Sequence, residues 1–444
     1  MKIVSILTIL VVVWGHSMLV EFTVENYRSF KERHTFSLLA SKDKNLLEEN
    51  TFSVNEKTRL LKTVLIYGAN ASGKSNLFKA LRFFLKFSVT SGQRLQKGDE
   101  IGTQSFLFSK QTQKKPSQFE LIFYIKSNDL FTRYRYGFTA DNMHISEEHL
   151  FVVNKVREVM LFVRNNQNFD CSKTSFKEGN NVNFETVREN ATFLSECANR
   201  NGPVSGAIIS YFRNISITSG LSNLSRFTLN RIEKGEKLDR IVRFLQFADI
   251  QVRNLQNKKL PVDFESDVKD PALAEAFKKS FPNMMSDEVY YGHALYDGEN
   301  EAGEYSLHQE EESNGTRKLF SYAGLVLDAL DNGNILFIDE FDSSLHPLII
   351  ENIMKLFNSP QYNPKNAQLV VSCQAVNIMT NKFFRRDQIW FCEKDMYGAT
   401  DLYSLFDFDE PVRKDASFNK NYLEGKYGAV PSIDVIKLQM GCKE

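Results

Sequence analysis

A glycine-rich stretch, Gly68-Ala-Asn-Ala-Ser-Gly-Lys-Ser75, combines residue types that suit the binding of a phosphate chain. It follows the apolar, β-branched run Thr63–Tyr67 and precedes a segment in which Leu77, Leu81 and Phe84 recur at helical spacing. Glycines let backbone N–H groups close around an anion, and the positive end of the following helix dipole points at that anion. A strand, this loop and a helix in that order predict a phosphate-binding P-loop.

Each position of this loop has an expected part in holding a nucleoside triphosphate and its metal ion. Lys74 can reach the β- and γ-phosphates, and the Ser75 hydroxyl is placed to ligate Mg²⁺. ATP and Mg²⁺ are therefore the expected cofactors. The expected nucleotide-binding residues of the loop are Gly68, Asn70, Ala71, Ser72, Gly73, Lys74, Ser75 and Asn76.

A second strand supplies the acidic residues that such a loop needs. The apolar run Ile335–Ile338 has the composition of a buried parallel strand, and Asn332-Gly333 ends a helix before it. Asp339 follows at the carboxyl end of the strand, where it can hold Mg²⁺ through its water shell, and Glu340 can polarise the attacking water. The alternative is a buried strand that ends in two solvated acids.

A third segment has the features of an anion site at a helix start. Ser313-Asn314-Gly315 precedes an amphipathic helix, and a serine hydroxyl with free N–H groups there suits an anion. An ordinary helix cap explains the segment equally well when it is considered alone. Its place a short way before Asp339 makes the order of the motifs informative.

This order of motifs resembles the ABC-type ATPase heads of the Rad50, SMC and RecF group. The opening "FTVENYRSFKE" resembles the first strand of those heads, where an Asn-x-Arg-Ser segment lies near the nucleotide, and this implies nucleotide contacts for Asn26 and Arg28. Closer still is the stand-alone ATPase family of bacterial abortive-infection and anti-phage systems, which includes OLD-like and RloA-like proteins. "ESNGTRKL", "DEFDSSLHP" and "RKDASFNKNYLEGKYGAVP" are similar to segments of that family. The resemblance extends over about residues 18–431 and is loose between 165 and 300.

The resemblance implies the α/β fold of a P-loop NTPase, an ABC-type ATPase head. It also implies a homodimer or higher oligomer in which two copies pack head to tail. Each ATP would be held by the P-loop of one copy and by the Ser313–Gly315 segment of the other. In such systems the effector, a TOPRIM-type nuclease or another toxin, is encoded separately, so we expect a partner of that kind.

The rest of the chain divides by pattern. Segments between about 101 and 165 carry β-branched and aromatic residues separated by turn signals, which predicts an antiparallel β subdomain beside the parallel core sheet. Residues 166–300 are polar at first and then helical, without sustained heptads, which predicts a mainly helical insertion and no long coiled coil. We therefore expect an N-terminal ATPase lobe at 18–165, and a C-terminal lobe with the acidic strand, a hairpin and a tail at 301–444.

Two glutamines are further candidates for the site. Gln104 precedes the antiparallel segments and is a candidate for sensing Mg²⁺, although an ordinary turn residue explains it as well. Gln374 follows the apolar run "QLVVS", at a position where related heads carry a histidine that contacts the γ-phosphate. Glutamine can donate a hydrogen bond but cannot carry a proton or a positive charge, so slow hydrolysis is expected. If the strand end is shifted, Gln374 is instead a neutral loop residue.

Overall charge gives no argument for nucleic acid or for a membrane, because 55 basic residues balance 55 acidic ones. Within 205–260, however, Lys and Arg outnumber Asp and Glu. That surplus could contact a phosphate backbone, so DNA stays open as a partner, but a solvated helix face explains it as well. The cysteines are scattered without a C-x-x-C pair and indicate reduced structural thiols.

The first residues resemble an export signal. A lysine precedes the apolar run Ile3–Trp14, and this run is too short to span a bilayer. A strand pattern of alternating apolar residues begins near Leu19, directly after Met18. Because Mg-ATP is a cytosolic ligand, we interpret residues 1–17 as a leader or a misassigned start, and we expect a cytoplasmic protein with no membrane association.

The leading interpretation is an ATPase that acts as sensor or scaffold of a bacterial anti-phage defence system, with an ATP-dependent dimer controlling a separate effector. The alternative is a RecF- or Rad50-like ATPase that binds DNA in repair or maintenance. A transporter ATPase subunit fits less well because of the long insertion. Glu393 and Asp395 suggest a TOPRIM site, but the second acidic pair is missing and the remaining chain is too short.

Overall fold

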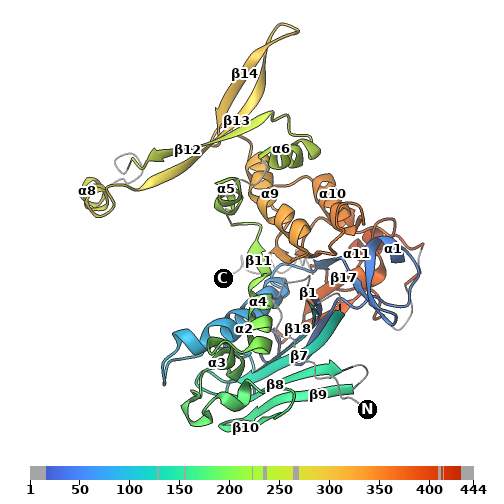
Figure 1. Ribbon diagram of the computed structural model, residues 1–444. Coiled ribbons are helices and arrows are strands. Elements are labelled where there is room, and N and C mark those ends of the chain that lie inside the picture. The colour runs from blue at the N-terminus through green and yellow to red at the C-terminus, as the bar shows by residue number, and fades with distance from the viewer. Residues whose placement is uncertain are drawn as a thin grey trace, which may run out of the picture. The chain divides into compact units, whose positions relative to one another are not determined.

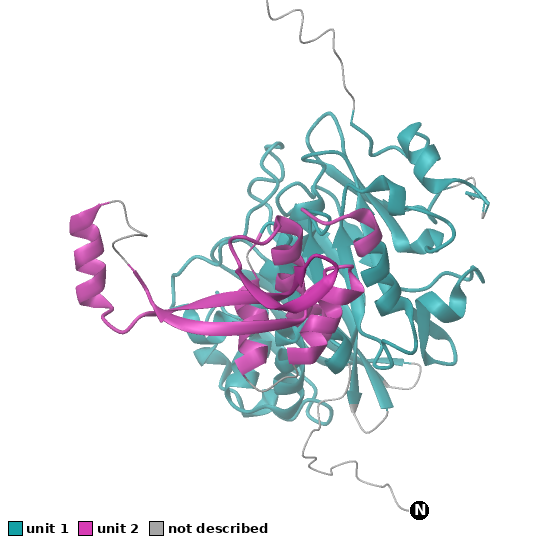
Figure 2. Ribbon diagram, turned by 90° about the horizontal axis from the view of Figure 1, so that it is seen from above, with its two compact units in different colours: residues 1–221, 329–343, 350–444 teal, residues 222–328, 344–349 magenta. Residues whose placement is uncertain are grey.

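The structure, a computed structural model, describes residues 17–127, 130–154, 157–222, 224–233, 238–263, 270–408, 412–413 and 415–431. The chain divides into two compact units, shown in different colours in Figure 2. Unit 1 comprises residues 1–221, 329–343 and 350–444, and unit 2 comprises 222–328 and 344–349. Except for Ser17, the expected leader lies outside the described residues. The domain boundaries expected from the sequence stay a prediction.

A parallel sheet in unit 1 carries the residues of the expected site. Its strand order is β11-β15-β16-β5-β17-β18, and only the pair β17–β18 is antiparallel. The strands β5, β15 and β16 are rich in aliphatic and β-branched residues, as expected for strands covered on both faces. The bounds are β5 Thr63–Tyr67, β11 Ile215–Ser219, β15 Ile335–Asp339, β16 Gln368–Ser372, β17 Ile389–Lys394 and β18 Thr400–Ser404.

A seven-stranded antiparallel sheet, ordered β10-β9-β8-β7-β6-β1-β2, lies in the same unit (Figure 1). Together the two sheets confirm the predicted α/β class, with a parallel core sheet and an antiparallel β subdomain. A separate two-stranded sheet pairs β3 Thr51–Asn55 with β4 Thr58–Leu61. The bounds of the seven strands are β1 Ser17–Glu25, β2 His34–Ser37, β6 Ser117–Ser127, β7 Leu130–Ala140, β8 Ile145–Asn154, β9 Arg157–Asn165 and β10 Asn168–Cys171.

The helices that lie wholly or mainly in unit 1 include the long helix that follows the P-loop. That helix, α2, spans Lys74–Arg94. The others are α1 Leu47–Asn50, α3 Phe193–Asn199, α4 Pro203–Arg213, α10 Pro347–Asn358 and α11 Phe418–Leu423. Short 3-10 turns are η1 Gly179–Asn181, η2 Phe184–Thr186, η3 Val376–Ile378 and η4 Arg386–Gln388.

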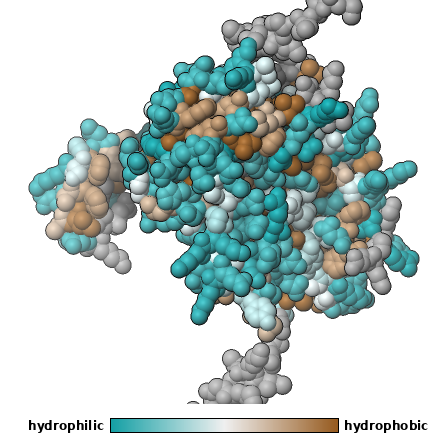
Figure 3. Space-filling view, turned by 90° about the horizontal axis from the view of Figure 1, so that it is seen from below, coloured by the Kyte–Doolittle hydropathy of each residue, from teal (hydrophilic) through white to brown (hydrophobic). Residues whose placement is uncertain are grey.

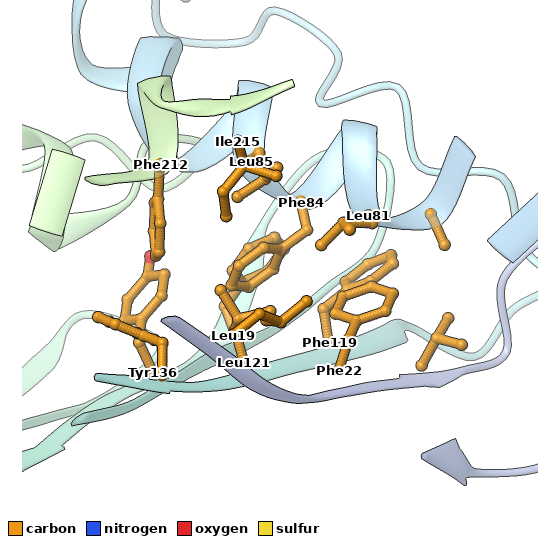
Figure 4. Close-up of a cluster of buried hydrophobic side chains, with 14 of the residues drawn as sticks. Leu19, Phe22, Leu81, Phe84, Leu85, Phe119, Leu121, Tyr136, Phe212 and Ile215 are labelled. Atoms are coloured by element: carbon orange, nitrogen blue, oxygen red, sulfur yellow. The ribbon is translucent and has the colours of Figure 1, made fainter. Parts of the chain in front are cut away.

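Helix α2 is held by side chains from both sheets. Phe84 stacks on Phe138 of β7 with ring centroids 5.4 Å apart, and it meets Phe22 of β1 edge-on at 5.9 Å. Figure 4 shows Phe84 pointing from the helix toward the strands that carry Phe22 and its neighbours. Phe78 meets Phe337 of the parallel strand β15 edge-on at 5.7 Å. The helix that begins at the P-loop is therefore fixed in orientation by the core.

Buried polar side chains join the two sheets. The amide of Gln368, at the start of β16, accepts a hydrogen bond from the Leu19 N–H at 2.8 Å and donates to the Leu19 and Leu61 carbonyls at 3.1 and 3.2 Å. The buried Lys62 ammonium donates to the Asn358 carbonyl at 2.9 Å, and burial lowers its pKa to about 8. Buried polar groups are stable only when they are bonded in this way, so they fix how β1 meets β16.

Unit 2 combines helices with a three-stranded antiparallel sheet in the order β12-β13-β14. The sequence predicted the helices but not this sheet, because β12 and β14 are mostly exposed and lack a clear alternation of apolar residues. The strands are β12 Asn254–Pro261, β13 Met285–Asp297 and β14 Asn300–His308. The helices are α5 Ser225–Glu233, α6 Leu238–Phe247, α8 Pro271–Ser280 and α9 Asn314–Asn332, of which α9 continues into unit 1 after Asp328.

Helices α5 and α9 cross closely within unit 2. A Cβ on Gly324 would lie 2.7 Å from the Cα of Thr228, so glycine allows this approach. The Thr228 hydroxyl donates to the Phe320 carbonyl at 2.9 Å and accepts from the Gly324 N–H at 3.0 Å. Arg231 pairs with Asp328 at 2.6 Å. These contacts fix the middle of α9, from Phe320 to Asp328.

No helix in the described parts of the chain is both long and apolar enough to cross a membrane. The face shown in Figure 3 is largely hydrophilic, with separate apolar patches.

We expect Phe84→Ala to lower the free energy of unfolding by about 3–5 kcal/mol, because it leaves a cavity between helix and sheet. Urea denaturation followed by circular dichroism measures the change. Leu130→Ala is the control, since Leu130 is 74% exposed in the same unit. Equal shifts of the unfolding midpoint in the two variants would contradict a core centred on Phe84.

Candidate functional site

The carboxyl ends of three parallel strands bring the predicted residues to one edge of the sheet. Strand β16 lies between β5 and β15, with Ser372 paired to Ile66 and Val371 paired to Ile338. The P-loop follows β5, Asp339 ends β15, and Gln374 lies just beyond β16. In open α/β sheets, ligands bind at this edge.

Gly68 and Gly73 give the P-loop a backbone course that other residues cannot follow. Their φ angles are 150° and 115°. A Cβ on Gly68 would lie 2.2 Å from the Cys392 carbonyl oxygen, and one on Gly73 would lie 2.1 Å from Thr400 Oγ1. The loop therefore passes against β17 and β18 with room only for glycine.

The loop offers donors to an anion at the start of α2. The buried Lys74 ammonium donates to the Gly68 and Ala69 carbonyls at 2.6 and 3.0 Å. The Ser72 hydroxyl is buried and has no hydrogen-bond partner among the described residues. The first N–H groups of a helix also lack intrahelical partners. A triphosphate fits this cradle, because its oxygens can accept from the Ser72 hydroxyl, from the free helix N–H groups and from the remaining N–H of Lys74.

The two acids at the carboxyl end of β15 are held by one serine of β16. Ser372 Oγ donates to Asp339 Oδ1 at 2.5 Å and accepts from the Glu340 N–H at 2.8 Å. Glu340 has a φ of 53°, so the chain turns sharply there. Its carboxylate makes no hydrogen bond to a described residue, which leaves it able to polarise water.

Gln374 lies beside the P-loop. Its Nε2 donates to Asn70 Oδ1 at 3.4 Å, and its side chain is exposed. The Asp342 carboxylate accepts from the N–H groups of Gln374 and Ala375 at 2.7 and 2.8 Å, and the Tyr67 hydroxyl donates to the Ala375 carbonyl at 3.2 Å. Asp342 and Tyr67 thus fix the course of the chain at Gln374 and Ala375, just after β16. The role of Gln374 toward a phosphate stays a prediction.

Asn26 is engaged with the loop that precedes β6. It is buried, its Nδ2 donates to the Thr112 and Lys115 carbonyls at 3.0 and 2.8 Å, and its Oδ1 accepts from the Phe106 N–H at 3.1 Å. The Arg28 N–H donates to the Gln104 carbonyl at 2.7 Å, and the Gln104 side chain is exposed. Asn26 holds the loop, and nucleotide or metal contacts by these three residues stay predictions.

Two hydroxyls that the sequence analysis did not identify join this segment to the P-loop. Ser29 Oγ accepts from Asn76 Nδ2 at 2.8 Å and lies 2.8 Å from Thr400 Oγ1. Thr400 Oγ1 is also 2.8 Å from the Ser72 carbonyl oxygen. Ser29 lies in the "NYRSF" part of the opening segment that resembles the first strand of the ATPase heads, so the sequence did indicate that this region lies near the site. Thr400 has the sequence context of an ordinary β-branched strand residue and gives none.

Ser313 and Gly315 lie in unit 2 and are described within it. Ser313 Oγ accepts from the Thr316 N–H at 3.0 Å and so caps α9. A Cβ on Gly315 would lie 3.4 Å from the Ser344 carbonyl oxygen. Next to Ser313, Glu312 lies 2.5 Å from His293 of β13. A helix cap and an anion-binding segment both fit this geometry.

The acids of the hairpin have structural partners. Glu393 accepts from the Tyr403 hydroxyl at 2.9 Å, and the Asp395 carboxylate accepts from the N–H groups of Tyr397 and Ala399 at 2.9 and 2.7 Å. In the described residues, no group of three or more His, Cys, Asp and Glu could hold a metal ion. The predicted Mg²⁺ ion at Ser75 and Asp339 would therefore need nucleotide oxygens and water as its other ligands.

The described cysteines are free thiols. Two of them, Cys373 and Cys392, are buried beside the site, and burial raises the pKa of each thiol to about 12. Both stay protonated at neutral pH, so neither is a nucleophile for this site.

Residues 64–373 match the family model described as "AAA domain, putative AbiEii toxin, Type IV TA system". The match starts within β5 and ends just after β16, so it includes the P-loop, the Ser313 segment and the two acids at the carboxyl end of β15. No curated protein matches the chain.

We expect Ser372→Ala to lower kcat for Mg-dependent ATP hydrolysis about tenfold, because Asp339 and the Glu340 backbone lose a shared partner. Steady-state hydrolysis gives kcat, and fluorescent ATP analogues give affinity, which should change little. Ser216→Ala, on strand β11 of the same sheet, is the matched control. A normal kcat in the Ser372 variant would contradict its positioning role.

Proposed function

The chain belongs to this AAA-domain family and is an AAA-family ATPase, and from that premise we propose that it acts as sensor or scaffold of a bacterial anti-phage defence system. The observation that carries the ATPase site is the meeting of Lys74, Asp339 and Glu340 at one edge of the sheet. The family description links the domain to a toxin and to a toxin–antitoxin system, which supports the defence role. The similarity to OLD-like and RloA-like proteins supports it further.

The residues of the site fall into two groups, those that bind the nucleotide with its metal ion and those that act on the attacking water. The P-loop N–H groups and Lys74 would hold the phosphates, while Ser75 and Asp339 would hold the metal ion. Bound Mg²⁺ neutralises charge on the phosphate oxygens. Glu340 polarises the attacking water, and Gln374 orients it by donating a hydrogen bond from its amide.

The second half of the site comes from another copy of the chain. The Ser313–Gly315 segment offers a capped helix start to a phosphate, as in the heads of the Rad50 and SMC group that the chain resembles. Two copies would then close head to tail over two ATP molecules. Hydrolysis would release them, so ATP sets the lifetime of the dimer.

The effector is a separate protein, a TOPRIM-type nuclease or another toxin, controlled by opening and closing of this dimer. The family description, which pairs a toxin with a toxin–antitoxin system, supports a partner. The described part of the chain offers no acidic metal cluster of the kind a TOPRIM nuclease needs. The proposed place of action is the cytoplasm, where Mg-ATP is supplied.

We expect Glu340→Gln to bind ATP normally and to lengthen the lifetime of the dimer, because the water-polarising carboxylate is gone and the phosphate contacts remain. Lys74→Ala should lose ATP binding and the dimer together. Lys79→Ala, an exposed lysine of the same helix, should behave as wild type. Sedimentation velocity with and without Mg-ATP measures size, and a Glu340→Gln protein of unchanged size would contradict the dimer.

We expect Gln374→His to raise the single-turnover rate of hydrolysis about ten- to a hundredfold, with little change in ATP affinity. A histidine can carry charge near the γ-phosphate, which glutamine cannot. Quenched-flow measurements give the rate. A wild type that already turns over quickly, with no gain in the variant, would show that Gln374 does not contact the phosphate.

A further inference from the structure

Large apolar side chains stand out of unit 1 on two loops beside the P-loop. Phe108 is 76% exposed on the loop before β6, while Met396 and Tyr397 are 88% and 70% exposed on the turn between β17 and β18. We propose that Phe108 and Tyr397 form the platform on which the nucleobase of the bound nucleotide stacks. This inference rests on the proposed function, because it assigns the base at the same triphosphate site.

The two loops touch each other at a glycine. A Cβ on Gly398 would lie 2.8 Å from Cδ2 of Phe108, and Gly398 has a φ of 82°. On the Phe108 loop itself, the buried Phe106 meets the Phe108 ring edge-on, with centroids 5.7 Å apart and an interplanar angle of 84°. Phe108 is therefore held in one place although most of its surface is open.

The turn that presents Tyr397 is rigid. The Asp395 carboxylate accepts from the N–H groups of Tyr397 and Ala399, and the Gly398 N–H donates to the Asp395 carbonyl at 3.1 Å. The Asp395 N–H in turn donates to the Ala399 carbonyl at 2.9 Å. An exposed aromatic ring on such a turn loses little conformational freedom when a ligand stacks on it.

The turn that carries Tyr397 is connected to the start of α2 through Thr400. Thr400, two residues after Gly398, lies 2.8 Å from the Ser72 carbonyl oxygen, and it contacts Asn76 through their shared partner Ser29. With a strand rise of about 3.3 Å per residue, Gly398 lies roughly 7 Å along the chain from Thr400. A nucleoside joined to phosphates at the P-loop can cover that distance.

The loop that carries Phe108 is also connected to the start of α2, through the segment Asn26–Ser29. The Asn26 amide accepts from the Phe106 N–H, and the Arg28 N–H donates to the Gln104 carbonyl. Asn26 and Arg28 belong to the short segment whose Ser29 contacts Asn76. Aromatic residues from two separate parts of the chain are thus held at one side of the P-loop.

A base suits this surface better than a protein partner does. A stable protein interface needs about 20–30 residues a side, whereas these loops present only a few side chains. Alanine substitution of a stacking aromatic side chain weakens the binding of a base roughly 5- to 150-fold, and such stacking accepts any base. The platform would therefore add affinity for a nucleotide without strong selection among bases.

The test compares two ligands on the full chain by isothermal titration calorimetry with Mg²⁺ present. One is the non-hydrolysable ATP analogue AMPPNP, and the other is inorganic tripolyphosphate, which has no base. We expect Phe108→Ala and Tyr397→Ala each to weaken AMPPNP binding about tenfold and to leave tripolyphosphate binding unchanged. Tyr397→Phe should keep wild-type affinity. Leu423→Ala, 69% exposed in the same unit, is the matched control.

Other outcomes overturn the platform. Equal losses for both ligands in the Tyr397 variant would mean that the turn supports the P-loop only. Unchanged affinities for both ligands would show that these rings have no role in binding the nucleotide. If the variants then also sedimented differently from wild type with AMPPNP, the rings would belong to contacts between copies of the chain. Wild-type protein that binds neither ligand would overturn the proposed function itself, and the platform with it.

Discussion

The pairing of β16 between β5 and β15 is the constraint on which the whole site depends. The strands are parallel, so they are joined by long crossovers and their carboxyl ends meet at one edge. Ser372, the last residue of β16, reaches Asp339 on one side while its strand borders the P-loop strand on the other. A register slip of one residue would turn Ser372 to the opposite face and leave Asp339 without this partner.

Strand β18, which comes late in the chain, supports the P-loop, which comes early in it. Thr400 of β18 fills the space beside Gly73 that a side chain there would need, and it also contacts Ser29 and the Ser72 carbonyl. Such close contact between backbone and side chain explains why the loop needs glycine at that position. The P-loop is therefore a short motif in sequence, but its shape depends on three separate segments of unit 1.

The sequence points directly to the parts of the candidate site that are local. Gly68, Gly73 and Lys74 are recognisable because strand, loop and helix follow each other directly, and Asp339 because a buried apolar run ends there. Ser372 and Thr400 are ordinary strand residues until the sheet brings them against those motifs. The unit 2 sheet escaped prediction for another reason, since its exposed strands carry no apolar alternation.

Helix α9 joins two of the motifs of the proposed dimer within one chain. At its start, the Ser313 segment is held to β13 by the Glu312–His293 contact, and Phe320 on its first turns packs edge-on against Tyr291 of the same strand at 5.8 Å.

The same helix then continues into unit 1 and leads directly into β15, the strand that ends at Asp339. In the proposed head-to-tail dimer, each chain would touch one ATP through its Ser313 segment and a second ATP through its own P-loop. One continuous helix therefore joins the Ser313 segment to the strand of Asp339 within each chain. The covalent order of the motifs, Ser313 segment, helix and acidic strand, would thus give each chain of the proposed dimer a contact to both ATP molecules.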